Sequence, residues 1–143
     1  MKRIIYLSLI LIWMITVFCF SNENAENSSN TSGKVVETIV EIFYKGISEE
    51  EKIEKVEILQ PIVRKGAHLT IYTIGGILLF LFCNTYDLVL KKKILYAIMI
   101  GGIYAIIDEI HQGFIPGRAP QVMDVLIDTV GVSLRSTNYS INK

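Results

Sequence analysis

The feature that most constrains this chain is a set of apolar blocks that carry almost no charge. Residues 4–20 contain no charged side chain, and residues 66–86 contain none unless His68 is protonated. A helix needs about 20 mainly apolar residues to cross the roughly 30 Å hydrocarbon core of a membrane. Both blocks therefore predict membrane-spanning helices. The whole chain predicts an all-α, polytopic membrane bundle, because a soluble domain of this size intersperses its apolar residues with charge.

Two later blocks are less regular. Residues 94–107 are too few to cross alone, but a helix that continues through Asp108 and Glu109 to residue 114 is long enough. Residues 122–134 include two aspartates and predict a short, tilted crossing, with a half-inserted helix as the alternative. The sequence thus predicts a single domain over residues 1–143, with spans at residues 4–20, 66–86, 94–114 and 122–134.

The first block could instead be a signal peptide that is removed by cleavage. Cleavage requires small residues at the cut site, whereas residues 17–20 are bulky, so an uncleaved anchor is favoured. Four crossings place both termini on one side of the membrane. The short loop before the third span contains the three lysines 91–93, and positively charged loops tend to stay inside. We therefore expect both termini to be cytoplasmic.

The polar stretch between the first two spans changes character along its length. Residues 22–33 are rich in Asn, Ser and Glu and predict a surface loop. Apolar residues then recur at helical spacing and predict an amphipathic helix that lies on the membrane or caps the bundle. Ser48 and Glu51 predict a capping box that begins a second helix, which runs toward Gln60, and Pro61 begins the approach to the next span. Together these elements form a predicted outer helical segment over residues 34–61.

Two polar clusters hold the only two histidines of the chain. In the first cluster, Arg64, His68 and Tyr72 are spaced four residues apart and would form one stripe of a helix. The second cluster surrounds His111, and the two aspartates of the last block share a third stripe. Charged groups near hydrocarbon are costly without a partner or a task, so we expect the stripes to converge in one outward-facing recess. The candidate site residues are Arg64, Lys65, His68, Tyr72, Asp108, Glu109, His111, Gln112, Arg118, Asp124 and Asp128.

These candidates divide by their chemistry. The catalytic candidates, which are suited to proton transfer, are His68, Asp108, Glu109 and His111. The ligand-binding candidates are Arg64, Lys65, Tyr72, Gln112, Arg118, Asp124 and Asp128, and the arginines among them match phosphate or carboxylate groups. A structural alternative stays open, in which the cations and anions of the cluster pair with one another and lock the helices together.

Other classes of site find little support in the sequence. The segment from Asp108 to His111 lacks the spacing of a zinc-binding His-Glu-x-x-His motif, so we assign no metal and no cofactor. The formal net charge is zero, and no basic stripe with interleaved aromatic residues occurs. Nucleic acid is therefore not an expected partner.

Taken together, the polar motifs resemble those of the VanZ-like family. The matching elements are Phe20-Ser21, Arg64-Lys65-x-x-His68-x-x-x-Tyr72, Tyr104-Ala105-x-x-Asp108-Glu109-x-His111-Gln112-x-Phe114-x-Pro116-Gly117-Arg118, and Asp124-Val125-Leu126-Ile127-Asp128-x-x-Gly131. The resemblance implies a small multi-pass membrane protein of bacteria, and the namesake of the family is associated with low-level teicoplanin resistance. Members commonly continue the last helix with further apolar residues, whereas this chain turns polar after residue 134.

The expected function follows from the cluster and the resemblance together. We expect a bacterial envelope protein whose outward-facing polar site binds or shields a membrane lipid or a lipid-linked cell-wall precursor. Such binding would change susceptibility to teicoplanin-type glycopeptides. The alternative is a membrane enzyme that hydrolyses or transfers a group on a lipid head group or wall precursor.

Overall fold

The structure is a computed structural model that describes residues 1–138 and shows an all-helical chain. No strand occurs among these residues, which confirms the predicted all-α class. The last five residues of the predicted domain lie outside the described part. The five helices are α1 (Lys2–Ser21), α2 (Ala25–Phe43), α3 (Glu49–Cys83), α4 (Leu90–Gln112) and α5 (Val122–Asn138).

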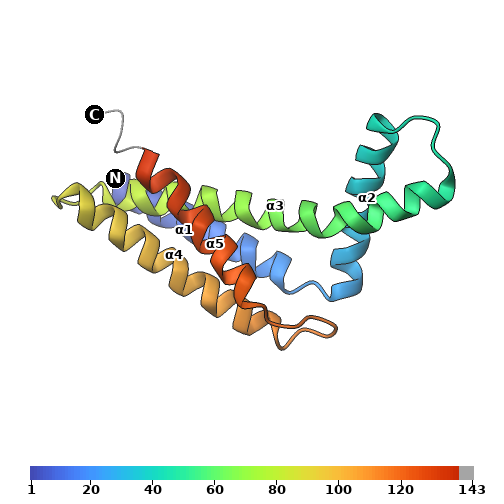
Figure 1. Ribbon diagram of the computed structural model, residues 1–143. Coiled ribbons are helices and arrows are strands. Elements are labelled where there is room, and N and C mark those ends of the chain that lie inside the picture. Colours follow the sequence, from blue (N-terminus) through green and yellow to red (C-terminus); the bar gives the residue numbers. More distant parts are fainter. Residues whose placement is uncertain (139–143) are drawn as a thin grey trace.

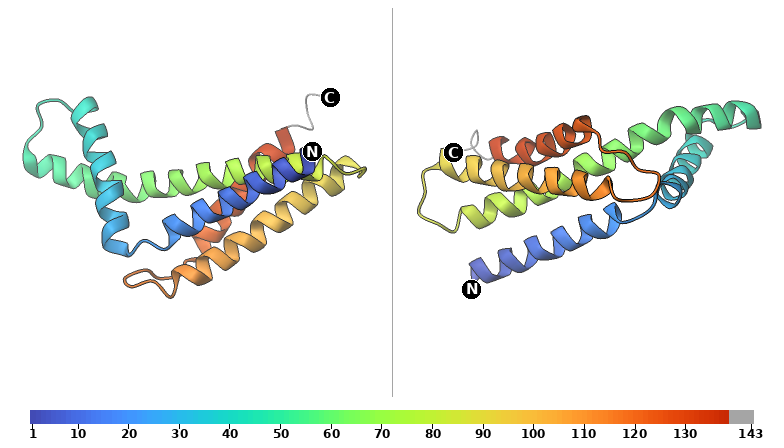
Figure 2. Two further views of the ribbon diagram at one scale, coloured as in Figure 1. Left: turned by 180° about the vertical axis from the view of Figure 1, so that it is seen from behind. Right: turned by 90° about the horizontal axis from the view of Figure 1, so that it is seen from below.

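Helices α1, α3, α4 and α5 form a bundle, while α2 and the first part of α3 extend beyond one end of it (Figure 1). Helix α3 is the centre of the assembly, because it contacts each of the other four helices. The start of α1, the end of α5 and the turn between α3 and α4 lie at one end, and the loop between α4 and α5 lies at the other (Figures 1 and 2).

Helix α3 is longer than sequence spacing predicts. It continues through Pro61, which lies inside the helix, so the predicted change of element at this proline is wrong. At 1.5 Å per residue its 35 residues extend about 52 Å, well beyond a hydrocarbon core of about 30 Å. The excess length is the acidic first part, which begins with the predicted capping box of Ser48 and Glu51. The polar turns of α3 thus extend from its apolar part without a break.

The predicted loop over residues 22–33 is also wrong, because α2 begins at Ala25. The Asn24 side chain accepts a hydrogen bond from the Asn27 N–H at 2.8 Å and caps the helix. Tertiary contacts then hold the polar first half of α2 against α3. The Gln60 amide donates to the Ser29 carbonyl at 2.7 Å and to the Ser32 hydroxyl at 3.1 Å. These contacts favour helix in a segment whose composition predicts a loop.

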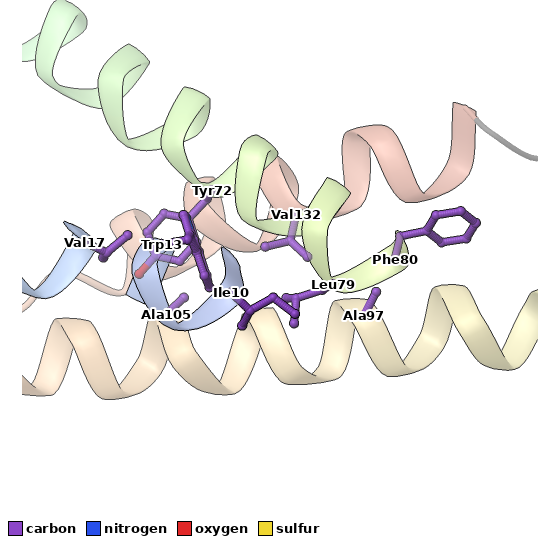
Figure 3. Packing of buried hydrophobic residues seen from close by; sticks show 9 residues of the cluster. All are labelled: Ile10, Trp13, Val17, Tyr72, Leu79, Phe80, Ala97, Ala105 and Val132. Atoms are coloured by element: carbon purple, nitrogen blue, oxygen red, sulfur yellow. The ribbon is translucent and has the colours of Figure 1, made fainter. Parts of the chain in front are cut away.

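The core is built where small residues allow helices to approach closely. Trp13 of α1 lies over Gly75 of α3, where any Cβ atom would overlap the indole. Its Nε1 donates to the Ile71 carbonyl at 2.9 Å, and its ring packs edge-on against Tyr72. Figure 3 shows Trp13, Tyr72 and their apolar neighbours packed between the helices. Small residues at such interfaces are typical of helices that associate within a membrane.

Small residues also allow helix α5 to pack closely against its neighbours. Val132 is fully buried between Gly76 of α3 and Gly101 of α4, and a Cβ at either glycine would overlap it. Gly131 lies against the Leu69 carbonyl of α3. Gly76, Gly101 and Gly131 therefore allow α3, α4 and α5 to pack closely.

Three helices, α1, α3 and α4, are long and apolar enough to cross a membrane. They overlap the predicted spans at residues 4–20, 66–86 and 94–114. Helix α5 has only 17 residues and does not join them, so its crossing stays a prediction. Large apolar side chains cover the outward surfaces of α1 and α4, including Ile4, Leu11, Ile12, Ile15, Leu95, Ile103 and Ile107. Surfaces of this kind suit contact with lipid.

Candidate ligand-binding site

The first polar cluster lines a cavity of about 420 Å³ beside α3, which we call the polar cavity. Helix α3 supplies one wall, α5 the opposite wall, and serines of α2 the rim. Its ionisable lining residues are Glu57, Arg64, Lys65, His68, Asp124 and Asp128. Five of these are predicted site residues, and the helical stripes of α3 and α5 explain why they meet there.

Two ionic contacts join α3 to α5 across the polar cavity. The Lys65 ammonium lies 3.7 Å from Asp124, and the Nδ1 atom of His68 lies 3.5 Å from Asp128. Asp128 is 1% exposed and Asp124 is half-buried. Because each aspartate lies one helical turn from the other, both present oxygen atoms to the same side of α5.

A second cavity, of about 290 Å³, lies beside the first along α3, and we call it the apolar cavity. Its walls are mainly apolar side chains of α1, α2 and α3, including Val17, Phe20, Val35, Val63, Ala67 and Ile71. Tyr72 also lines it. The two cavities share Ser32, Arg64 and His68. They are therefore neighbours that meet at one stripe of α3.

Arg118 joins the apolar cavity from the loop between α4 and α5. Gly117 has a φ of +79°, which glycine adopts readily, and this conformation helps to place the next residue over α1. The Arg118 guanidinium donates to the Phe20 carbonyl at 3.3 Å. Burial, with a smaller effect of the nearby Arg64 cation, lowers the pKa of Arg118. Arginine nevertheless stays charged at neutral pH.

Arg64 differs from the other cations of the cluster. It is half-buried and lines both cavities, yet it has no side-chain hydrogen bond and no salt bridge within residues 1–138. Lys65 and Arg118, by contrast, each contact a protein oxygen. A guanidinium in this position has all its donors available for a ligand.

Two residues of the second polar cluster form a buried network with Ser21, which also lines the apolar cavity. The Ser21 hydroxyl donates to Asp108 Oδ1 at 2.5 Å, and the Gln112 amide donates to Asp108 Oδ2 at 3.1 Å and to Ser21 Oγ at 3.2 Å. All three side chains are at most 3% exposed. We call this the Ser21–Asp108–Gln112 network. It joins the end of α1 to the end of α4.

Glu109 and His111 also contact protein groups, although neither side chain lines a cavity, and the partner of Glu109, Gln121, does line the polar cavity. One Glu109 oxygen accepts a hydrogen bond from the Gln121 backbone N–H at 2.6 Å, which holds the loop that leads into α5. The His111 ring stacks on Phe18 of α1 with its centroid 4.7 Å away. The stripes of α3 and α5 therefore share the polar cavity, and the stripe of α4 adjoins this cavity through the contact between Glu109 and Gln121. Asp108, Glu109, His111 and Gln112 line neither cavity.

Buried polar atoms without a hydrogen-bond partner gather in this region. Within the described chain they are His68 Nδ1, Tyr72 OH, Glu109 Oε2, His111 Nε2, Arg118 Nε, Asp124 Oδ1 and Asp128 Oδ1. Every one belongs to a predicted site residue. Because buried polar atoms are nearly always paired, a group of unpaired ones indicates contacts with water or a ligand. No group of three His, Cys, Asp or Glu side chains in residues 1–138 is arranged to hold a metal ion.

Comparison with known families agrees with this arrangement of motifs. The family model described as VanZ/LLP1 matches residues 6–141, nearly the whole chain. The protein belongs to the VanZ/LLP1 family. No curated protein and no solved structure matches the chain. Family membership therefore covers all five helices, and the roles of individual residues rest on the geometry described above.

Some residues of this VanZ/LLP1 protein's site escaped the sequence analysis. Ser21 is part of the Phe20-Ser21 motif element but was assigned no role, although it donates to Asp108. Ser29, Ser32 and Gln60 line the polar cavity from segments that composition assigned to loop or solvated helix. Helical spacing finds residues that share a face of one helix. It gives no signal for contacts between helices that are distant in sequence.

Proposed function

We propose that this VanZ/LLP1 protein binds a membrane amphiphile at the junction of the two cavities. The head group would occupy the polar cavity, and an acyl or prenyl chain would occupy the apolar cavity. The observation that carries the proposal is that a charged cavity and an apolar one share Arg64 and His68. A lipid or a lipid-linked cell-wall precursor has this pairing of a polar and an apolar part.

The same site offers a route to a resistance phenotype. A bound or shielded envelope amphiphile would be less accessible to lipophilic glycopeptides of the teicoplanin type. In this proposal α3 crosses the bacterial membrane, both termini are cytoplasmic, and the polar cavity lies at the outer surface. The length of α3, which exceeds a hydrocarbon core, supports a site placed where the helix leaves the bilayer.

Photo-crosslinking with a lipid that bears a photoreactive acyl chain tests the proposal. Ala67 is exposed and lines the apolar cavity, so Ala67→Trp should fill that cavity without entering the core. We expect crosslinking to residues 63–72 to fall by about tenfold, as for loss of roughly 1.4 kcal/mol of binding. Thr70→Trp is the control, since Thr70 is exposed on the same helix but lines neither cavity. Equal crosslinking in both variants would contradict the proposal.

One contact favours a second candidate function, that of a membrane enzyme. His68 lies 3.5 Å from the buried Asp128 at the polar cavity, and a carboxylate beside an imidazole can orient it for proton transfer. His68 is the only one of the four catalytic candidates that lines this cavity. Mass spectrometry of lipids and wall precursors, with and without the protein, separates the two functions. A modified product that disappears with His68→Gln would favour the enzyme, and unchanged chemistry favours binding.

A further inference from the structure

We infer that the ligand is zwitterionic, with a phosphate bound at Arg64 and an ammonium group bound by the carboxylates of the polar cavity. The inference rests on the proposed function and specifies its ligand class. Such a site would select an amino-phospholipid or a similar phosphoamine amphiphile over an amphiphile whose head group ends in a hydroxyl. The distribution of charges along the two joined cavities supports this ligand class.

The cationic part of the site lies at the boundary between the cavities. Arg64 lines both of them and has no protein anion as a partner in the described chain. Arg118 lines only the apolar cavity, from the opposite wall. A phosphate at this boundary would meet a guanidinium that can form two parallel hydrogen bonds. This is the position of the phosphate in a lipid whose chain lies in the apolar cavity.

Three of the four carboxylates that line the two cavities lie in the polar cavity, and the fourth, Glu23, lines the apolar cavity together with Arg118. Glu57, Asp124 and Asp128 line only the polar cavity, where the permanent cations are Arg64 and Lys65. Once a phosphate neutralises Arg64, the carboxylates outnumber the remaining lysine. A neutral hydroxyl would leave this excess negative charge in place. An ammonium group would compensate it.

The hydrogen-bonding state of the aspartates points the same way. Asp128 is 1% exposed, and its Oδ1 has no hydrogen-bond donor, although His68 lies 3.5 Å away. Oδ1 of Asp124 also has no donor. An ammonium group carries three N–H donors and accepts none, so it suits carboxylate oxygens that lack a donor, even though the Lys65 ammonium lies 3.7 Å from Oδ1 of Asp124. Apolar chain, phosphate and ammonium would then follow in the order in which an amino-phospholipid presents them.

Competition between two lipids in purified full-length protein tests this inference. Phosphatidylethanolamine and phosphatidylglycerol with identical acyl chains are supplied in equal amounts in mixed micelles, and bound lipid is counted by native mass spectrometry. We expect phosphatidylethanolamine to be preferred by at least about threefold, as for one charge-assisted contact. Arg64→Gln should reduce binding of both lipids by about fivefold or more.

Two acidic variants test the ammonium contact. Asp128→Asn should bring the ratio of bound phosphatidylethanolamine to bound phosphatidylglycerol close to one, while total lipid binding persists. Glu57→Gln should also reduce this ratio, without risk to folding, because Glu57 is exposed. Asp87→Asn is the matched control, since Asp87 is exposed and lines neither cavity. Displacement of bound lipid by soluble O-phosphoethanolamine, but not by glycerol 1-phosphate, would show that the head group carries the recognition.

The possible failures are distinguishable. Equal binding of both lipids by the unaltered protein, a preference for phosphatidylglycerol, or equal displacement by both soluble phosphates would overturn the zwitterionic ligand and leave amphiphile binding intact. A preference that survives both Asp128→Asn and Glu57→Gln would also overturn it. Lipid binding that is the same in Ala67→Trp and Thr70→Trp would instead overturn the proposed function itself.

Discussion

Replacement of Ser21 by alanine should release the end of α1 from α4. The Ser21 hydroxyl is the donor to Asp108 Oδ1 at 2.5 Å and the acceptor from the Gln112 amide at 3.2 Å. Gln112 keeps a partner in the variant, because it also donates to Asp108 Oδ2 at 3.1 Å. Oδ1 of Asp108, however, loses the donor that Ser21 supplies, at a position that is 3% exposed.

The size of the effect follows from that single lost partner. A buried acceptor left unsatisfied costs about 1–3 kcal/mol. Hydrogen bonds between helices in a membrane average less, about 0.6 kcal/mol with a maximum near 1.7, because unfolded helices in lipid also find partners. We therefore expect Ser21→Ala to lower the free energy of unfolding by about 1–2 kcal/mol.

The sole tryptophan of the chain reports this release directly. Trp13 lies on α1 against Gly75 and Tyr72, so its fluorescence follows the docking of α1 during unfolding by sodium dodecyl sulfate in mixed micelles. Ser8→Ala is the matched control, because Ser8 is exposed on the same helix. Its unfolding free energy should match that of the unaltered protein.

A double-mutant cycle with Asp108→Ala isolates the contact. If Ser21 stabilises the protein through Asp108, the two substitutions together should cost about 1 kcal/mol less than the sum of their separate effects. Additive costs, or a Ser21→Ala variant as stable as Ser8→Ala, would refute the idea that this network holds α1 in place.

Three further substitutions test the packing and the loop. Gly75→Val should lower the free energy of unfolding by about 1–3 kcal/mol and shift Trp13 fluorescence to the red, because the valine side chain would displace the indole. Gly66→Ala is the control, because a Cβ at Gly66 meets nothing within 4 Å, and it should be neutral or stabilising. Equal costs for the two variants would contradict the close packing at Gly75. Glu109→Ala should speed amide exchange at Gln121 and lower the free energy of unfolding by about 1–2 kcal/mol. Glu109→Gln keeps an acceptor and should cost less than half as much. Equal exchange rates in the two variants would argue against the contact. Pro61→Ala should slow amide exchange in the following turn and stabilise α3 by about 1–3 kcal/mol, because alanine restores a backbone N–H inside the helix. A loss of stability would show that the proline is needed there.

Features that depend on neighbouring residues could be predicted from the sequence. The uncharged blocks anticipate α1, α3 and α4, and the pair Ser48 and Glu51 anticipates the capping box. The four-residue spacing of Arg64, His68 and Tyr72 places them along one side of α3, where all three line the apolar cavity. In each case the decisive interaction lies within one or two helical turns, so the period of the helix is sufficient to infer it.

Features that depend on contacts between distant segments could not be predicted. The first half of α2 is polar, yet Gln60 of α3 bonds to two of its serines, and Val36 and Val40 of the second half are fully buried. Helix α3 is continuous through Pro61, and the adjacent Gln60 is held to α2 by two hydrogen bonds. Gln112, one partner of Asp108, lies one helical turn away, but the other partner, Ser21, is 87 residues away in sequence, and helical spacing does not identify it.

The separation of the polar residues into two groups changes how substitutions at Asp108 should be interpreted. Asp108 and Gln112 hold α1 against α4, so their loss would weaken any function by loosening the bundle, whether or not the protein is an enzyme. Arg64 and Asp128 line the polar cavity. A binding defect from Arg64→Gln with unchanged Trp13 unfolding would therefore locate the ligand, whereas a defect from Asp108→Asn that appears together with altered unfolding would identify a structural role. The two readouts measured together separate the network that supports the site from the residues that contact the ligand.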